Sequence, residues 1–154
     1  MRSLLKLGLA AALVVTLVQV TPAAAAGPLV SQGKPVTASS SESAAFPASA
    51  AVDGNLGTRW SSAFSDPQWL QVDLGATYAV DQVSLNWEAA YARAFTIEVS
   101  TNATTWSTVH STTTSAGGTQ TLAVSGSARY VRLNLTTRST QWGYSLWELS
   151  LIHI

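Results

Sequence analysis

The sequence predicts an all-β fold, an antiparallel β-sandwich, and three observations support this prediction. Large apolar residues alternate with polar ones in several short runs, a period of two that is typical of strands with one buried face. Clusters of Gly, Ser, Thr, Asn and Asp separate the runs, as turns between antiparallel strands do. No stretch after residue 26 sustains the apolar period of a helix. Several such strands in one domain indicate a sandwich or a barrel.

The first 26 residues have the composition of a secretory signal peptide. Residues 1–6 are a short basic start, residues 7–20 are almost wholly apolar, and residues 23–26 are a run of alanines. The apolar run is shorter than the roughly 20 residues that a membrane-spanning helix needs. We therefore exclude 1–26 from the fold and expect a secreted protein, cleaved at the end of the alanine run. A buried helix or a membrane anchor is the alternative.

The remaining chain divides into a lead-in and one domain. Residues 27–35, with two glycines and two prolines, form a lead-in that we expect to be exposed, and residues 36–154 form the domain. Residues 111–118 are rich in Ser, Thr and Gly, which predicts a loop inside the domain. The alternating positions expected to face the core are Leu70, Val72, Leu74, Val83, Leu85, Trp87, Phe95, Ile97, Val99, Val131, Leu133, Leu135, Leu149 and Leu151.

Composition limits the partners of this domain and the sources of its stability. Without Arg2 and Lys6 the chain keeps six basic residues against eight acidic ones, a net charge of about −2, and no basic patch for nucleic acid. It has no cysteine, so an exported domain must gain its stability from its core or from a metal ion. Six tryptophans exceed what a small core needs, so we expect some to face a ligand. Those interpreted as packing residues are Trp60, Trp69, Trp87, Trp106 and Trp147.

Six short segments, spread over almost the whole mature chain, carry a resemblance to a known family. They are GKPVTASS at 33–40, AVDGN at 51–55, TRW at 58–60, WLQVDLG at 69–75, RYVR at 129–132 and GYSLWE at 143–148. Together they resemble the discoidin domain, also called the coagulation factor 5/8 type C domain, and among carbohydrate-binding modules they resemble family 32. The resemblance implies an eight-stranded antiparallel jelly-roll β-sandwich, of the galactose-binding-domain-like type, with ligand-binding loops at one end. It agrees with the strand prediction, which does not depend on it.

The turn at residues 53–55 predicts a cation site. Hard cations prefer oxygen ligands gathered by a tight turn, which Asp53, Gly54 and Asn55 can supply. The resemblance implies a structural calcium ion, or a sodium ion in its place, that joins this turn to the last strand. The alternative is that Asp53 only caps a turn and Glu148 is solvated. By position, the ligands would be the carboxylates of Asp53 and Glu148, an oxygen of Thr58, and the backbone carbonyls of Ala50, Asn55 and Trp147.

The loops also contain candidates for a sugar site, where an aromatic ring stacks on a pyranose and polar groups line the rim. Residues 87–91, WEAAY, resemble a subgroup of modules attached to bacterial chitosanases and β-glucanases. Trp142, before Gly143 at a loop tip, is a candidate second ring, and Phe46 and Tyr91 are further candidates. The resemblance implies a stacking ring at Phe64, a tyrosine in many related modules, and polar contacts from Glu42, Arg59, Glu88 and Tyr144.

Several of these residues have a plain structural alternative. Arg59 could brace the predicted metal loop, and Glu88 could be an ordinary exposed residue at the end of a strand. Glu42 lies in a serine-rich loop, where charge is common, and Tyr91 could belong to the core. The assignment of these side chains to a ligand therefore depends on whether the fold brings them together.

Two carboxylates in one cleft, Glu42 and Glu88, favour a sugar with a protonated amine, because charged partners strengthen hydrogen bonds. We therefore expect chitosan oligosaccharides as the ligand, with β-1,3-glucan second, and predict that N-acetylation weakens binding. Galactose-type ligands elsewhere in the family usually meet a histidine. Neither His110 nor His153 is suitably placed in the sequence.

A glycosidase also needs two carboxylates, so catalysis is a competing hypothesis. No nucleophile motif, histidine triad or catalytic metal cluster accompanies Glu42 and Glu88. We therefore expect a non-catalytic, monomeric module that directs an attached or associated glycoside hydrolase to its polysaccharide. The module either acts alone or belongs to a longer enzyme. The alternative is a discoidin-type adhesion domain for a protein or lipid surface, which the lack of basic residues disfavours.

Overall fold

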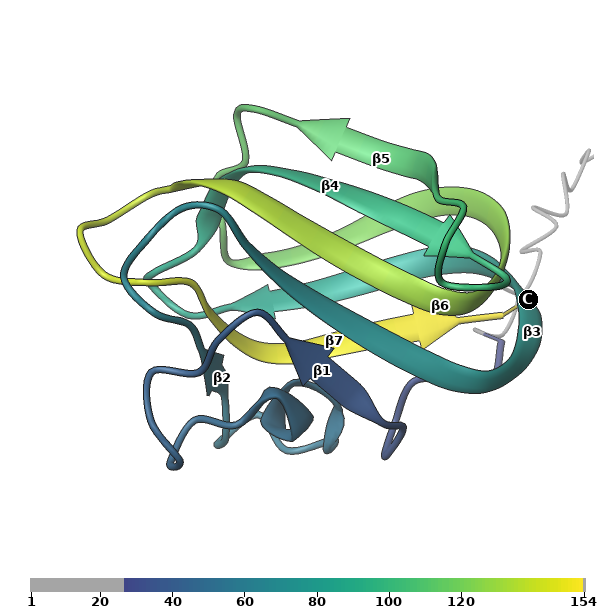
Figure 1. Cartoon of the computed structure of the whole chain (residues 1–154), viewed down its shortest axis with the longest axis horizontal. Helices are drawn as coiled ribbons and strands as arrows, with labels where there is room; N and C mark the ends of the chain where they lie inside the picture. The colour runs from purple at the N-terminus through teal and green to yellow at the C-terminus, as the bar shows by residue number, and fades with distance from the viewer. Residues whose placement is uncertain (1–26, 154) are drawn as a thin grey trace, which may run out of the picture.

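The computed structural model describes residues 27–153, so the predicted signal peptide lies outside the described residues. Within that range the chain forms seven strands and one 3-10 helix (Figure 1). No helix in this part of the chain is long and apolar enough to cross a membrane. The elements are β1 (Val36–Ala38), η1 (Ala48–Val52), β2 (Trp60–Ser61), β3 (Gln68–Trp87), β4 (Ala92–Ser100), β5 (Ser107–Thr112), β6 (Thr119–Arg138) and β7 (Ser145–Ile152).

The two long strands, β3 and β6, build the sandwich by bending together. They pair antiparallel over most of their length, with register shifts between Asp73 and Tyr78 and between Val80 and Gln82, and Figure 1 shows them turning over at one end of the molecule. One layer therefore holds β2, β7, the later half of β3 and the earlier half of β6. The other holds β1, β4, β5, the earlier half of β3 and the later half of β6. The predicted all-β antiparallel sandwich is confirmed. Residues 27–153 contain seven strands rather than the expected eight, and two of them, β3 and β6, run unbroken through both layers.

The core lies between the layers, where the alternating pattern placed it. All fourteen predicted core positions are buried, and Trp60 is fully buried with its indole N–H donating to the Ser40 carbonyl at 3.0 Å. Trp69, Trp106 and Trp147 are only half-buried, so their interpretation as packing residues is wrong for the core. Trp106 precedes β5 in a loop, and the other two occupy outward positions of β3 and β7.

The lead-in is bound to the last strand rather than exposed. The Val30 amide donates to the Leu151 carbonyl at 2.8 Å, and the buried Ser31 hydroxyl accepts from the Leu151 amide at 2.9 Å. The prediction of an exposed segment is therefore wrong at Val30 and Ser31, since β7 leaves a free edge that this segment pairs with. Both ends of the described chain are thereby fastened to each other.

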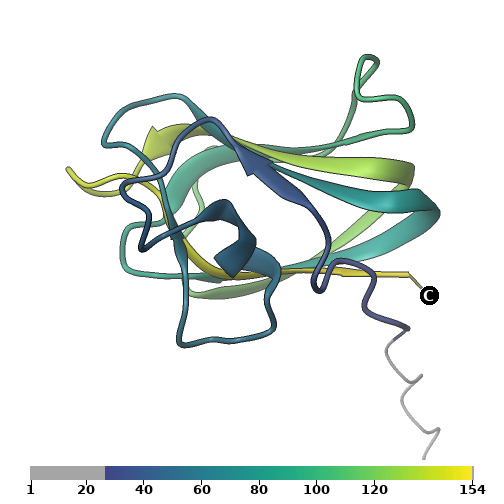
Figure 2. The same cartoon turned by 60° about the horizontal axis from the view of Figure 1, so that its bottom comes forward.

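The loops that follow β2, β3 and β6 meet at one end of the sandwich. The amide of Ser145 donates to the Ala90 carbonyl at 2.8 Å, and the amide of Ser62 donates to the Tyr144 carbonyl at 2.9 Å. The helix η1 packs beside β1 and β7, next to the turn at residues 53–58 (Figure 2). The predicted loop at 111–118 begins two residues later than expected, because β5 continues to Thr112.

Candidate functional site

A pocket of about 220 Å³ opens where these loops meet. All six residues predicted to contact a ligand line it, although they come from five separate segments between the helix and the strands. Sequence reasoning missed four further lining residues, because their small side chains suggest no ligand contact, although three of them lie in the segments WEAAY and GYSLWE. The complete lining is Glu42, Arg59, Ser61, Phe64, Glu88, Ala90, Trp142, Gly143, Tyr144 and Ser145.

Two aromatic rings stand exposed at the mouth of the pocket. Phe64 is 47% exposed and Trp142 is 54% exposed, and their rings meet edge to face with centroids 5.6 Å apart. An edge-to-face contact leaves a ring face open on at least one partner. Large exposed aromatic side chains that border a pocket are typical of a binding surface rather than of a core.

Arg59 lines the pocket and is held there by its neighbours. Its guanidinium lies 4.4 Å from the ring centre of Phe46 and 5.4 Å from that of Trp147, and its Nε donates to the Ser61 hydroxyl at 3.2 Å. Cation–π contacts on both sides fix the position of this charge. Arg59 therefore braces the wall and also presents a fixed cation to the pocket, whereas Phe46 supports it from outside the lining.

The two acidic residues of the pocket differ in how firmly they are held. The Glu88 carboxylate accepts from the Ala90 amide at 2.9 Å, and the Glu88 amide donates to the Ser145 carbonyl at 3.0 Å. The Glu42 amide donates to the Ser61 carbonyl at 2.7 Å, but its carboxylate is exposed. Among the described residues neither carboxylate forms an ion pair, so both remain available to an external cation.

Tyr144 belongs to the wall of the pocket and differs from its predicted role as a polar contact. Its side chain is fully buried, and its hydroxyl donates to the Asp66 carboxylate. Burial, followed by this hydrogen bond, raises the pKa of the Tyr144 hydroxyl well above its usual range. The hydroxyl is therefore a neutral donor that already has its partner, and the ring provides shape.

The remaining candidates lie elsewhere. Tyr91 is half-buried against the core and outside the pocket, as its structural alternative expected. His110 contacts the Phe95 ring, and His153 contacts the Ala79 carbonyl, so neither histidine lines the pocket.

The turn at residues 53–58 is held by its own polar side chains. The Asp53 carboxylate accepts from the Asn55 amide at 2.9 Å and from the Thr58 hydroxyl. Gly54 has a φ of +76°, which glycine adopts without strain. Its amide donates to the Glu148 carboxylate at 3.2 Å, so the turn and the last strand do meet, as the cation-site hypothesis requires.

Glu148 carries the clearest sign of a cation site. The residue is 5% exposed, and its Oε1 is buried without a hydrogen-bond partner among the described residues. Burial raises its pKa to about 7, with a smaller rise from the Asp53 charge and an opposing effect of the Gly54 hydrogen bond. A buried carboxylate is costly unless a charge compensates it. The donor chemistry here therefore fits a hard cation.

The backbone beside Glu148 supports the same conclusion. A register shift between β3 and β7 pairs Asn86 with Glu148 and Trp87 with Leu146, which leaves Trp147 opposite no residue of β3. Such a bulge re-aims neighbouring groups. Among the described residues no three His, Cys, Asp or Glu side chains cluster, so a cation here would take most of its ligands from backbone carbonyls and Thr58.

An antiparallel sandwich with a ligand-sized pocket at its loop end defines the class of this domain. The profile of the F5/8 type C domain matches residues 35–149, and the chain belongs to this family. The resemblance seen in the sequence is thereby confirmed. No functionally curated protein matches the chain.

Solved structures with the same fold include close relatives. Chitosan-binding module 1 of a chitosanase/glucanase from Paenibacillus sp. IK-5 is 47% identical, with 80% of this chain and 98% of that chain covered and a TM-score of 0.78. Module 2 of the same enzyme, in complex with chitotriose, is 43% identical over 79% of this chain and 98% of that one, also with a TM-score of 0.78. The family 32 module of NanJ from C. perfringens, in complex with galactose, is 22% identical over 81% and 98%, with a TM-score of 0.72, and shares the fold.

Proposed function

We propose that this domain is a non-catalytic carbohydrate-binding module whose loop-end pocket binds chitosan oligosaccharides, with β-1,3-glucan as the second ligand. The observation that carries the proposal is one pocket that combines two unpaired carboxylates, Glu42 and Glu88, with two exposed rings, Phe64 and Trp142. The relatives described as chitosan-binding modules support the choice of sugar.

The acidic side chains explain the preference for an amino sugar. A protonated amine that enters the pocket can donate to a carboxylate in a charge-assisted hydrogen bond, which is roughly twice as strong as a neutral one. Glu88 is the better-held acceptor because the Ala90 amide fixes its orientation. Arg59 cannot receive an amine, and we assign it to the hydroxyl oxygens of the sugar.

The rings supply the apolar half of the contact. A pyranose presents C–H groups on its faces, and an open aromatic face can cover them. We assign the stacking position to Phe64, with Trp142 as a second ring beside it. The hydroxyl that a tyrosine would add at position 64 is missing here.

We also propose a structural calcium ion at the turn. Asp53, Thr58 and Glu148 would hold it with side-chain oxygens, together with the backbone carbonyls of Ala50, Asn55 and Trp147. The ion would neutralise the two carboxylates and link the turn to β7. The buried, unpartnered Oε1 of Glu148 supports this assignment.

In the cell the module would be exported and would direct an attached or associated glycoside hydrolase to its polysaccharide. Calorimetric titration of residues 27–154 with chitotriose and with a β-1,3-linked glucose trimer, in the presence of calcium, tests the proposal. We expect saturable heat with chitotriose and weaker heat with the glucan, and no cleavage products after long incubation with either. Absence of heat with both sugars would overturn the proposal. In that case sedimentation with liposomes would test the adhesion alternative.

A further inference from the structure

The two exposed rings at the pocket lie on two different loops, and no covalent cross-link joins these loops near the rings. Phe64 lies between β2 and β3, and Trp142 lies between β6 and β7. Exposed side chains lose rotational freedom when they bind, at a cost that grows with their mobility. Contacts that fix both loops before the sugar binds would therefore strengthen binding without touching the sugar.

The bases of the loops are already fastened by backbone contacts. The Ser62 hydroxyl accepts from the Tyr144 amide at 2.8 Å, and a Cβ at Gly143 would lie 2.4 Å from the Ser62 carbonyl oxygen. Only glycine permits this close approach. These contacts fix the stems of the loops but not the outer turn that carries Trp142.

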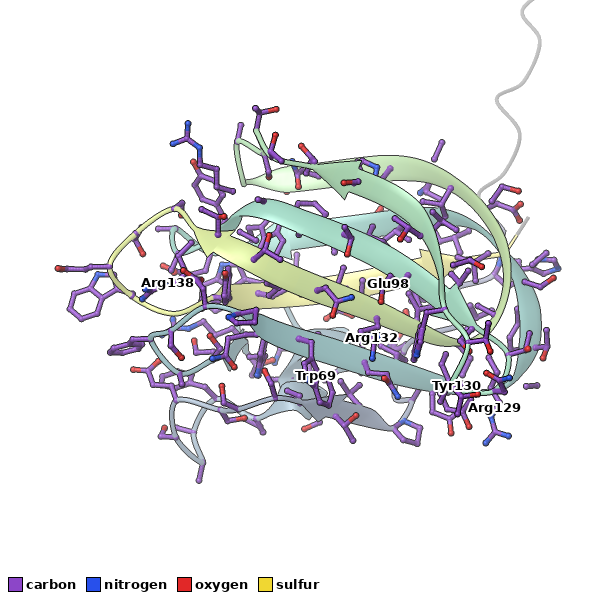
Figure 3. All side chains as sticks on the ribbon, turned by 45° about the horizontal axis from the view of Figure 1, so that its top comes forward. Trp69, Glu98, Arg129, Tyr130, Arg132 and Arg138 are labelled. Atoms are coloured by element: carbon purple, nitrogen blue, oxygen red, sulfur yellow. The ribbon has the colours of Figure 1, made fainter. Side chains whose placement is uncertain are left out.

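The outer turn is held by Arg138, the last residue of β6. Its Nη1 donates to the carbonyls of Gln141 at 3.1 Å and Trp142 at 3.3 Å, within its own loop. Its Nε lies 3.2 Å from the Asp66 carboxylate of the facing loop, as an ion pair, and has no aligned hydrogen-bond acceptor within residues 27–153. Asp66, two residues after Phe64, also accepts from the Tyr144 hydroxyl. Figure 3 shows Arg138 at the end of the molecule where these loops lie.

We propose that Arg138 is a positioning residue of the sugar site, because through Asp66 and the carbonyls of Gln141 and Trp142 it sets the two rings before the ligand arrives. A guanidinium presents several donors in a rigid fork and can hold two carbonyls and a carboxylate at once, whereas a lysine ammonium cannot reproduce this geometry. Arg138 does not line the pocket, so its effect on the sugar passes through Trp142 and Phe64. This inference rests on the proposed function.

Arg132 offers a matched control on the same strand. It forms an ion pair with Glu98 at 3.0 Å, and its side chain is 27% exposed, close to the 24% of Arg138. Figure 3 shows Arg132 and Glu98 on the face of the sheet, away from Arg138. Arg132→Lys therefore removes a comparable contact that has no connection to either ring.

The test combines a measurement without sugar and one with it. Fluorine NMR of protein labelled with 5-fluorotryptophan, with the Trp142 signal assigned by Trp142→Phe, reports on the free loop. We expect Arg138→Lys and Asp66→Asn to shift or broaden this signal, and Arg132→Lys to leave it unchanged. By calorimetry, we expect each of the first two variants to bind chitotriose about threefold to tenfold more weakly, the scale of one or two side chains ordered on binding. The double variant should lose less affinity than the two single losses added together, because both variants remove the ion pair that Arg138 and Asp66 share.

The outcomes separate this inference from the function beneath it. An unchanged Trp142 signal in Arg138→Lys, or an equal loss of affinity in Arg132→Lys, overturns the positioning role. A loss of affinity accompanied by a fall in thermal midpoint well beyond that of Arg132→Lys also overturns it, because the effect is then one of general stability. The wild-type protein could fail to bind chitotriose while Arg138→Lys still changes the Trp142 signal. This result would overturn the choice of sugar but not the contact between the loops.

Discussion

The Gly54 amide donates to the Glu148 carboxylate at 3.2 Å, and this contact joins the turn at residues 53–58 to the last strand. The other oxygen of that carboxylate is buried without a partner among the described residues. One well-placed hydrogen bond and one unsatisfied charge on the same group describe a site that a cation would complete.

Calcium should stabilise the folded domain, and Glu148→Gln should abolish the effect. A ligand that binds only the native state adds about 2.7 kcal/mol at a concentration 100 times its Kd. The glutamine keeps an oxygen for the Gly54 amide but loses the charge. Thermal unfolding with calcium and with a chelator measures the difference, and Glu98→Gln, whose carboxylate pairs with Arg132, is the control. An equal response of wild type and Glu148→Gln to calcium would rule out this ligand set.

The calcium effect should also depend on pH. Because burial raises the pKa of Glu148 to about 7, the calcium-free folded state favours the protonated form. The raised pKa of Glu148 stabilises the calcium-free folded state fully at pH values below its ordinary pKa of 4.5. This stabilisation is lost as the pH rises through about 7. Calcium needs the ionised form. The rise in thermal midpoint caused by calcium should therefore be larger at about pH 8 than at about pH 5, and a larger rise at the lower pH would contradict the assignment.

Removal of either exposed ring should weaken sugar binding without unfolding the domain. Phe64 and Trp142 are about half exposed, so their truncation leaves the core intact. Loss of an aromatic contact costs about 1 kcal/mol, or roughly fivefold to tenfold in Kd, and Phe64→Ala should cost more than Trp142→Ala if Phe64 is the stacking ring. Leu56→Ala removes an apolar side chain that is 63% exposed outside the pocket, and serves as the control. Calorimetry with chitotriose measures which of the two variants loses more affinity. If Phe64→Ala bound chitotriose as tightly as the wild type, the sugar would not stack on Phe64.

The two carboxylates should contribute unequally. Glu88 is oriented by the Ala90 amide, whereas the Glu42 carboxylate is exposed and free to rotate. A fixed acceptor loses less entropy on binding, so Glu88→Gln should weaken chitotriose binding more than Glu42→Gln. Both effects should shrink in high salt, since exposed charges are screened. A larger loss in Glu42→Gln would show that the amine contacts the serine-rich loop instead.

Much of the fold follows from local pattern. Residues such as Leu70 and Val72 alternate with polar neighbours, and every predicted core position is buried because a strand with one wet face allows no other register. The pattern failed where the chain is uniformly polar or short, as in β5, whose serines and threonines carry no alternation of large apolar residues. It also missed the pairing of Val30 with β7, since one edge contact leaves no periodic signal.

The candidate site was less accessible to sequence reasoning. The family resemblance identified five of the six residues that converge on the pocket, and a loop-tip position identified Trp142. Neither could show that the Tyr144 hydroxyl already donates to Asp66. The contact between Arg138 and Asp66 joins two loops far apart in the chain, and no spacing in the sequence indicates it. The extra residue at Trp147 in β7 is likewise visible only in the strand register.

The most direct test compares chitotriose with its fully N-acetylated counterpart, titrated into the calcium-loaded protein by calorimetry under the same conditions. The account predicts that the free amine binds at least about tenfold more tightly, because one charge-assisted hydrogen bond to Glu88 or Glu42 is lost on acetylation. It predicts further that Glu88→Gln narrows this difference. Equal affinity for the two trimers would contradict the claim that the pocket recognises a cationic sugar.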